Sequence, residues 1–376
     1  MPKPYIQEYI SINDIPDSFF TELGCDQSFY FSKLFLASFE EAHSTINYHY
    51  LVFLSNEKPI AIAILQQLCV SLENISKNLP YYLKVATTVK SYFNSKKTHI
   101  LVCGNVFLSG QYGLWIKEGT NRINIFDLLS QKLRSLQNTT KASVCLLKDF
   151  NSSQNNAASS AQKQHFQPFT VAPNMRIKVV WNNFENYKDS LKSKYRIKIN
   201  KADTTSKALI KKSLTALQIR NHQEILKKLY LNVASNASFN TAIIAIETYA
   251  LLKERFPNNV YFDTYSKNGK IVGFKTAFVT AGLLTAHYIG LDYAINKTDA
   301  IYPRMLNDYL RLGLLLGVKD INLGRTASEI KSTLGAIPEH LTCYIKNRRT
   351  VANVLFKPFV HAIKMTEYKQ HHPFKK

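Results

Sequence analysis

Residues 323–335, LGRTASEIKSTLG, combine the end of a strand with several groups that can do chemistry. Thr326 can cap a short helix together with the acid three positions later, and Gly335 can end that helix. Four charged or hydroxyl side chains would then gather at the carboxyl end of the strand-like run 318–324, where ligands usually bind in open α/β sheets. The members of this cluster are Arg325, Glu329, Lys331 and Ser332.

The side chains of this cluster suit an anionic ligand and an amine. Arg325 and Lys331 can hold anionic groups of a donor or acceptor through charge-assisted hydrogen bonds, with Ser332 beside them. Glu329 can orient those groups or an attacking amine. A well-capped helix with a surface ion pair fits the same residues, so the sequence leaves both interpretations open.

A second group of candidates lies on the predicted strand 285–292, TAHYIGLD. Strand alternation predicts that His287 and Tyr288 point to opposite faces. A neutral histidine can accept a proton from an attacking ammonium, because its unperturbed pKa is about 6.5, and Asp292 can orient the nucleophile. Ordinary packing of the two rings, and a turn or cap role for Asp292, are the alternatives.

The next predicted helix supplies two further candidates near its start. Tyr302 precedes Pro303, which is well placed for a first helical turn. Arg304 can meet a phosphate or carboxylate through two parallel hydrogen bonds. We count Tyr302 and Arg304 as candidate binding residues, with a solvated arginine as the alternative.

Positive charge is concentrated in the second half of the chain. The formal net charge is +22, and residues 171–376 hold 33 basic and 14 acidic side chains, against 15 and 12 in residues 1–170. Such a field favours nucleic acid, an anionic lipid surface or a phosphorylated substrate. A lysine-rich proteome produces the same bias without any function.

The most basic stretch, 188–212, holds nine Lys or Arg and two Asp. Helical spacing places Lys194, Lys198 and Lys201 on one face, beside an apolar stripe. This face is either solvated or a rim that steers an anionic donor or a membrane-bound acceptor.

The pattern of apolar residues predicts a mixed α/β protein with two domains. The polar stretch NSSQNNAASSAQKQH (151–165) reads as a linker or insertion loop. The expected parts are an N-terminal domain at 1–150, the linker or insertion at 151–170, a C-terminal domain at 171–350, and an amphipathic helix with a basic tail at 351–376. The predicted helices cover 27–39, 81–94, 122–137, 184–207, 220–234, 240–256 and 299–316.

Three features that the sequence lacks bear on the location of the protein and on metal binding. No apolar run approaches the roughly 20 residues that span a bilayer, and the N-terminus shows no secretory apolar region. Five scattered cysteines lack a C-x-x-C pair. We expect a cytoplasmic protein without a metal site, and peripheral contact with the inner face of the membrane is an option.

Four stretches resemble the acetyltransferase-like domain of the GNAT superfamily. They are WNNFENYKDSLKSKYRIKINKA (181–202), GKIVGFKTAF (269–278), TAHYIGLDY (285–293) and LGRTASEIKSTLGA (323–336). More narrowly, the chain resembles the tandem-GNAT branch that includes the Fem-type peptidoglycan aminoacyltransferases. In the first half, LVCGNVFLSGQYG (101–113) is the most family-like stretch. The resemblance implies two tandem GNAT-like domains, each a mixed, mostly antiparallel sheet flanked by helices.

The resemblance also implies the reaction and its place. It implies acyl transfer to an amine, with the donor held where two central strands splay apart. The backbone from His287 to Gly290 would then bind the acyl amide. No covalent enzyme intermediate is needed, because a neutral amine attacks a thioester or ester directly once it is positioned and deprotonated.

One departure from the superfamily pattern concerns the donor. Most acetyl-CoA users carry R/Q-x-x-G-x-G/A after the fourth strand, where backbone amides and a helix N-terminus hold the pyrophosphate. Here the corresponding stretch, LDYAINKTDAIYPRM (291–305), has no glycine. Fem-type relatives also lack this motif and use aminoacyl-tRNA. We expect no firmly bound cofactor, and either acyl-CoA or aminoacyl-tRNA as the donor co-substrate.

The sequence therefore predicts an N-acyltransferase whose acceptor is an amine, with a lipid-linked cell-envelope precursor as one option. The alternative is a tRNA-binding, nucleic-acid-binding or membrane-surface protein with a degenerate GNAT site. The chain shows no RNP-type aromatic run, no C2H2 spacing and no clear helix-turn-helix, which counts against a dedicated nucleic-acid reader.

Overall fold

The chain forms two compact units, each assembled from segments that are distant in the sequence. The computed structural model describes residues 4–71, 97–236, 242–349, 353 and 367–375. Unit 1 consists of Met1–Val171, Ser238–Ile244 and His340–Met365, and unit 2 of Ala172–Ala237, Ala245–Glu339 and Thr366–Lys376. No helix in the described part of the chain is long and apolar enough to cross a membrane.

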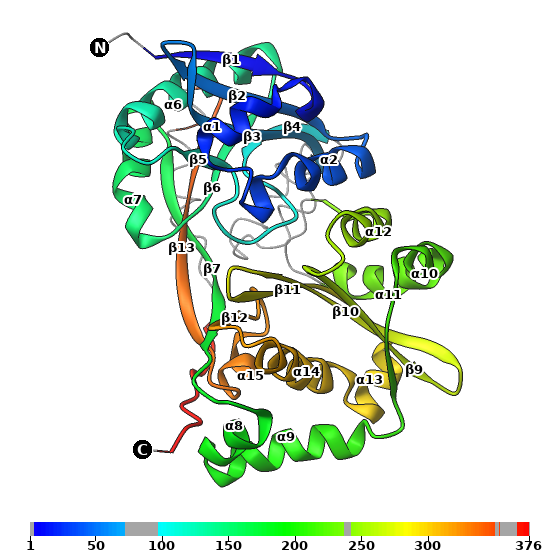
Figure 1. Ribbon diagram of the computed structural model, residues 1–376. Helices are drawn as coiled ribbons and strands as arrows, with labels where there is room; N and C mark the ends of the chain where they lie inside the picture. Colours follow the sequence, from blue (N-terminus) through cyan, green and yellow to red (C-terminus); the bar gives the residue numbers. More distant parts are fainter. Residues whose placement is uncertain (1–3, 72–96, 237–241, 350–352, 354–366, 376) are drawn as a thin grey trace, which may run out of the picture. The chain divides into compact units, whose positions relative to one another are not determined.

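Unit 1 is built on a mixed sheet with helices packed against it (Figure 1). The strands, in spatial order, are β1 (Tyr5–Tyr9), β2 (Asn47–Ser55), β3 (Lys58–Ser71), β4 (Lys97–Cys103), β6 (Val144–Phe150) and β13 (Ile337–Asn347), with β5 (Leu114–Ile116) paired to β3. Its helices are α1 (Asp17–Leu23), α2 (Lys33–Ala42), α6 (Arg122–Thr139) and α7 (Ser152–Ala158). Leu129 and Leu133 of α6 are fully buried in the core of this unit.

The predicted linker at 151–165 is wrong, because this segment is folded into unit 1. It forms α7 and a 3-10 helix, Ser159–Gln164, and it contacts α6. Ala158 and Ala161 are fully buried in the core. Small side chains let a segment pack closely against a neighbouring helix, so polarity and small size were misleading here.

The strands of unit 2 are, in spatial order, β7 (Gln167–Lys178), β12 (Asp320–Asn322), β11 (Leu283–Leu291), β10 (Lys270–Thr280), β9 (Val260–Lys267) and β8 (Ile210–Ser213). Only β11 and β12 run parallel, since the other neighbouring pairs are antiparallel. The β9–β10 hairpin turns at Asn268 and Gly269, which both have positive φ. This arrangement confirms the predicted mixed α/β class.

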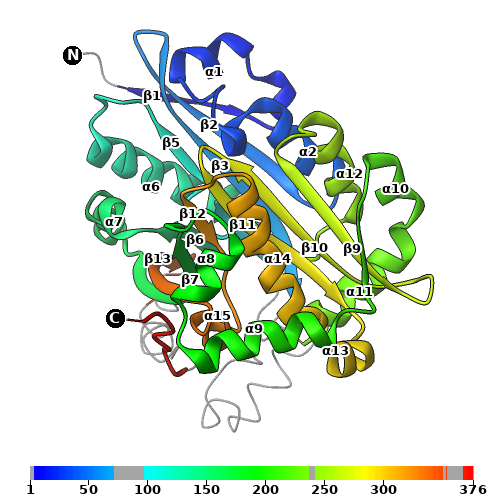
Figure 2. The same ribbon diagram turned by 60° about the horizontal axis from the view of Figure 1, so that its bottom comes forward.

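Helices cover both faces of the sheet of unit 2. One face carries α10 (Ala216–Asn221), α11 (Gln223–Ser235) and α12 (Ile246–Arg255), and the other carries α9 (Ser193–Thr205), α13 (Tyr293–Asp299) and α14 (Ile301–Leu315). Figures 1 and 2 show α14 between the sheet and α9. The last two helices of this unit are α8 (Phe184–Ser190) and α15 (Ser328–Ser332).

Two predicted helices differ from the structure. The single helix expected at 184–207 is two helices, α8 and α9, because Leu191 is extended (ψ 145°) and bridges to Phe374. The helix expected at 220–234 is likewise divided into α10 and α11. The helices predicted at 81–94 and 351–365 lie outside the described residues, apart from residue 353.

Candidate functional site

A β-bulge on β11 brings His287 and Tyr288 to the same face of the sheet. Lys275 of β10 pairs with Ile289, but Ala277 pairs with Ala286, so both His287 and Tyr288 lie opposite the single residue Thr276. The two rings are 4.5 Å apart. The prediction that they point to opposite faces is wrong, because a bulge adds one residue and interrupts the alternation of the strand.

The face that receives both rings is the one covered by α11 and α12. Tyr288 packs edge-on against Tyr230 of α11, with ring centroids 5.3 Å apart. The ring of His287 lies 4.8 Å from that of Phe278 and 5.7 Å from that of Tyr249 on α12. Bulges often re-aim side chains next to active sites.

A chain of hydrogen bonds runs from His287 back to the bulge itself. The His287 Nδ1 is 2.7 Å from the Tyr249 hydroxyl, which is 3.3 Å from Thr276 Oγ1. Thr276 Oγ1 in turn donates to the carbonyl oxygen of Tyr288 at 2.8 Å. Burial raises the pKa of Tyr249 well above its usual value, so this phenol keeps its proton.

The Thr276 hydroxyl lies between the Tyr288 carbonyl oxygen and the Tyr249 hydroxyl, and it is the donor toward both. Through Tyr249 these contacts hold the imidazole of His287 in one orientation. A neutral histidine held in this way is a candidate general base.

The edge of β11 beside the bulge loses its neighbouring strand. β12 pairs with β11 only from Leu283 to Thr285, and it ends at Asn322. The chain then turns through Gly324, Thr326 and Ala327, which all have positive φ. The predicted cap at Thr326 is wrong, since α15 begins at Ser328 after Ala327 and no side chain caps it.

Arg325 lies in this turn, close enough to Tyr288 to act on its titration. Burial and the neighbouring Tyr230 raise the pKa of Tyr288, whereas the positive charge of Arg325 works in the opposite direction. The predicted partners Arg325, Tyr288 and His287 therefore belong to one region at the open end of β11. Arg325 is half-buried, so its charge is only partly screened by water.

Lys331 is buried beneath the same turn. Its side chain reaches back from α15, and Nζ donates to the carbonyl oxygens of Gly324 at 3.1 Å and Arg325 at 2.6 Å. The residue is only 4% exposed, and burial lowers the pKa of the ammonium to about 7. This geometry favours a role in holding the turn that carries Arg325, rather than direct contact with an anion.

Glu329 and Ser332 contact the C-terminal segment. Glu329 is exposed, and its carboxylate lies 3.4 Å from His371 Nε2. Ser332 is fully buried, and its hydroxyl accepts from the backbone N–H of His371 at 3.1 Å. Neither contact brings these two side chains to His287.

Gly290 is the point where a helix approaches β11 most closely. A Cβ atom built there would lie 2.2 Å from the ring of Phe274 and 2.9 Å from the carbonyl carbon of Leu229 on α11. Any side chain at this position would push α11 away from the strand. Gly290 therefore supports the face on which the two rings of the bulge lie.

Asp292 and Tyr302 are engaged at the helix starts that follow β11. The Asp292 carboxylate caps α13 by accepting from the amides of Ala294 at 3.0 Å and Ile295 at 3.3 Å. The amide of Tyr302 donates to Asn296 Oδ1 at 2.8 Å. Protein side chains thus bind the amides that a pyrophosphate would need here, and one of these side chains is an acid.

Arg304, Lys194 and Lys198 lie away from the bulge. Arg304 donates Nε to both carboxylate oxygens of Asp308 at 3.1 Å, within an ion network that links α14 to Asp203 of α9. Lys194 and Lys198 are exposed on α9, while Tyr195 and Ile199, the residue after each of them, are buried. The predicted apolar stripe of this helix is confirmed.

Three residues of the site carry no signal in the sequence: Tyr249, Thr276 and Thr285. Tyr249 and Thr276 complete the hydrogen-bond chain described above. The Thr285 hydroxyl is buried, and it has no hydrogen-bond partner within the described residues. An isolated tyrosine on a helix and threonines within strands are too common to be singled out before the register of the strands is known.

The fold resembles that of solved tandem-GNAT and Fem proteins. A tandem GNAT protein from the clavulanic acid biosynthesis pathway is 10% identical, with a TM-score of 0.54, over 92% of this chain and 99% of its own. FemX is 10% identical with a TM-score of 0.53, over 94% of this chain and 100% of its own. The C-terminal domain of a putative lysylphosphatidylglycerol synthetase from Agrobacterium fabrum is 10% identical with a TM-score of 0.52, over 92% and 95%.

These similarities show that the chain has a fold like those of FemX and of a tandem GNAT protein, as the sequence predicts. No protein-family model matches the sequence, and a comparison with curated proteins gives no match. At 10% identity the shared feature is the fold, and any activity must be argued from the residues of this chain.

Proposed function

We propose that unit 2 is an N-acyltransferase that moves an acyl or aminoacyl group from an activated ester or thioester to an amine. The observation that carries this proposal is the bulge of β11, where hydrogen bonds through Tyr249 and Thr276 hold His287 in place. The same region holds a cation, Arg325, at an edge of β11 where the neighbouring strand has ended. The similarity of the fold to FemX and to a tandem GNAT protein supports the same reaction class.

In the proposed reaction, His287 acts as the general base. The imidazole takes a proton as the amine nitrogen bonds to the acyl carbon, and the carbon–oxygen or carbon–sulfur bond of the donor breaks. The proton then passes to the departing alcohol or thiol, so that the enzyme returns to its starting state. Tyr249 holds the imidazole in position through its hydrogen bond to Nδ1.

Arg325 is proposed to hold an anionic group of the donor or acceptor near the bulge. A guanidinium suits phosphate and carboxylate because its planar donors bind both oxygens at once. Lys331 is proposed to act indirectly. Its buried ammonium holds the carbonyl groups of Gly324 and Arg325, and so it positions the backbone that carries the Arg325 side chain. Glu329, Asp292, Tyr302 and Arg304 have structural contacts, so they are not included in the reacting group.

The donor is proposed to be an aminoacyl-tRNA rather than acetyl-CoA. Asp292 places a negative charge at the start of α13, where acetyl-CoA users hold pyrophosphate. Asn296 binds the amide of Tyr302 at the start of α14. A polyanionic tRNA also suits the excess of 33 basic over 14 acidic side chains in residues 171–376. The Fem-type resemblance implies the same donor, with a cell-envelope precursor as the amine acceptor.

A transfer assay tests this proposal. The protein is incubated with a lysine-containing peptidoglycan precursor and either tRNA charged with radiolabelled amino acids or radiolabelled acetyl-CoA. We expect label in the precursor only from tRNA, and none with His287→Gln. Transfer from acetyl-CoA with equal efficiency would reject the proposed donor, and transfer that is unaffected by His287→Gln would reject the site.

A further inference from the structure

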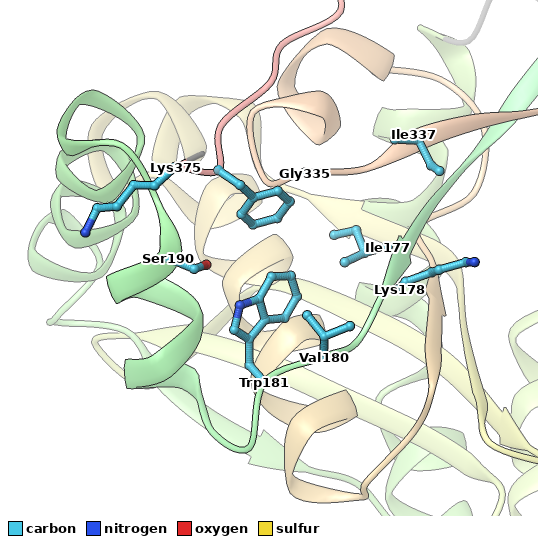
Figure 3. Close-up of a pocket in the computed structure, with 9 residues that line it drawn as sticks. Ile177, Lys178, Val180, Trp181, Ser190, Gly335, Ile337 and Lys375 are labelled. Carbon is cyan, nitrogen blue, oxygen red and sulfur yellow. The ribbon is translucent and has the colours of Figure 1, made fainter.

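An apolar groove opens on unit 2, away from the residues of the bulge. Its volume is about 430 Å³, and it lies between β7, α8 and the C-terminal segment. Figure 3 shows Trp181, Val180 and Ile177 facing this hollow, while the side chains of Lys178 and Lys375 point away from it on opposite sides. The apolar side chains of the lining are Ile177, Val180, Trp181, Ile337 and Phe374.

Several of these apolar groups are exposed to water. Val180 is 77% exposed and Ile337 is 54% exposed. The ring of Trp181 packs against Phe374, with centroids 5.0 Å apart, so the indole is held at the mouth of the groove. Exposed apolar residues gathered in one place usually mark an interaction surface.

Cations line and flank this groove. Lys178 and Lys375 line it, and Lys192 lies beside it because its amide donates to the carbonyl of Pro373 at 2.8 Å. The ammonium groups of Lys192 and Lys375 donate to the carbonyl oxygens of His372 at 3.0 Å and Asp189 at 2.7 Å, and none of the three lysines pairs with a carboxylate of the described residues. Glu185 is bound to Lys188 at 2.8 Å and Asp189 lies 3.9 Å from Arg196, while Asp320 and Glu339 share Arg176 at 3.5 Å and 2.8 Å.

We propose that this groove docks unit 2 on an anionic lipid bilayer. Val180, Trp181 and Ile337 enter the boundary of the acyl layer, and the three lysines meet the headgroups. Tryptophan favours the membrane interface because its ring is apolar and its N–H is polar. Apolar burial and attraction to anionic lipids act together in peripheral binding of this kind.

The lining of the groove favours lipid over a peptide. A bound peptide needs hydrogen-bond partners for its backbone. The only hydroxyl among the lining residues belongs to Ser190, and it already donates to the carbonyl of Tyr187 at 2.7 Å. An acyl chain requires no such partners, so the groove matches a lipid. The phosphate would meet Lys178 and the remaining N–H donors of Lys192 and Lys375, whose ammonium groups each already donate to one backbone carbonyl.

Vesicle co-sedimentation tests the proposal with the full chain. We expect binding to vesicles of phosphatidylcholine mixed with phosphatidylglycerol, and little binding to phosphatidylcholine alone. The double variant Val180→Asp, Ile337→Asp should weaken binding at least about tenfold, while Ile210→Asp should not. Ile210 is a matched control because it is 70% exposed on β8, at the opposite edge of the sheet.

Fluorescence provides a second readout that does not depend on the folding of the double variant. In a Trp115→Phe background, Trp181 is the remaining indole. Its emission should move to shorter wavelength with anionic vesicles, and lipids with brominated acyl chains should quench it. The variant Lys178→Gln, Lys192→Gln, Lys375→Gln should weaken binding and reduce its dependence on salt.

Four outcomes would overturn the proposal. The first three are wild-type protein that binds neither kind of vesicle, vesicle binding that is unchanged by the double variant, and an indole that brominated lipids fail to quench. Saturation of the groove by a soluble anionic amphiphile without vesicle binding would also reject bilayer docking. His287→Gln should bind vesicles like the wild type, so this result is independent of the proposed catalysis.

Discussion

The hydroxyl of Tyr249 and the Nδ1 of His287 lie 2.7 Å apart, although one residue is on α12 and the other is at the bulge of β11. This bond connects a buried phenol to the one imidazole on that face of the bulge. Through Thr276 it is connected to the carbonyl oxygen of Tyr288. The reactivity proposed for His287 therefore depends on a residue that makes no contact with the reacting atoms.

Tyr249→Phe should lower kcat at least about tenfold, equivalent to roughly 1.4 kcal/mol, with KM nearly unchanged. The ring keeps its packing, but Nδ1 of His287 loses its hydrogen-bond partner, so the pH profile of kcat should also shift. Steady-state kinetics across pH checks this. Tyr309→Phe is the matched control, because its hydroxyl bonds the carbonyl of Thr276 from the other face at 2.9 Å. If both variants lose activity equally, the effect is structural.

Arg325→Lys should lower turnover at least about tenfold with the fold intact, because it keeps the charge and loses the planar fork. Turnover and melting temperature, measured together, check this. Arg304→Lys should behave in the opposite way, with a lower melting temperature and nearly normal turnover, since Arg304 binds Asp308. Full activity of Arg325→Lys with the true substrates would return the turn to a purely structural role.

Lys331 should make stability depend on pH. Its pKa is about 7 in the folded protein and 10.5 ordinarily, so between these values the unfolded chain binds more protons. The free energy of unfolding should therefore rise with pH across this window, by at most about 1.4 kcal/mol per pH unit from this group. Below pH 7 Lys331 is charged in both the folded and the unfolded chain, so its destabilising contribution has reached its full size and no longer changes with pH.

Urea unfolding of the wild type and Lys331→Met at several pH values measures this contribution. The difference between the two proteins should change between pH 7 and 10, whereas Lys201→Met, on the exposed face of α9, should run parallel to the wild type. Parallel curves for Lys331→Met would mean that the ammonium is not buried as described.

Gly290→Ala should destabilise unit 2 by about 1–3 kcal/mol, because the new methyl group overlaps the ring of Phe274. Chemical unfolding checks the magnitude. Adding Phe274→Leu should recover part of the loss, since it removes the ring atoms in the way. No recovery would place the conflict at the backbone of Leu229 instead.

The sequence predicts the fold class well because that class follows from periodicity. Apolar alternation and helical stripes, such as Tyr195 and Ile199 on α9, depend only on neighbours within one element. The bulge depends on the register between two strands, so the common face of His287 and Tyr288 could not be read from TAHYIGLD alone. Thr276 could not be identified for the same reason, because its role comes from its position opposite both His287 and Tyr288.

The turn at 323–327 shows a different limit. The pattern predicts a cap at Thr326, but Thr326 and Ala327 are both left-handed. The Asn322 side chain accepts from the amide of Gly324 at 2.8 Å, and Lys331 binds the carbonyls that follow. These contacts come from a strand and a helix on either side, and they override the local preference for a capping box.

The division of each unit among distant segments also bears on how the chain folds during synthesis. Unit 1 lacks its β13 residues until His340–Met365 have been made, and unit 2 lacks Phe374, whose ring fills the space beside Gly335, until later still. Both units are therefore still incomplete when the ribosome passes residue 339, and their apolar surfaces stay open to aggregation until the last segments emerge.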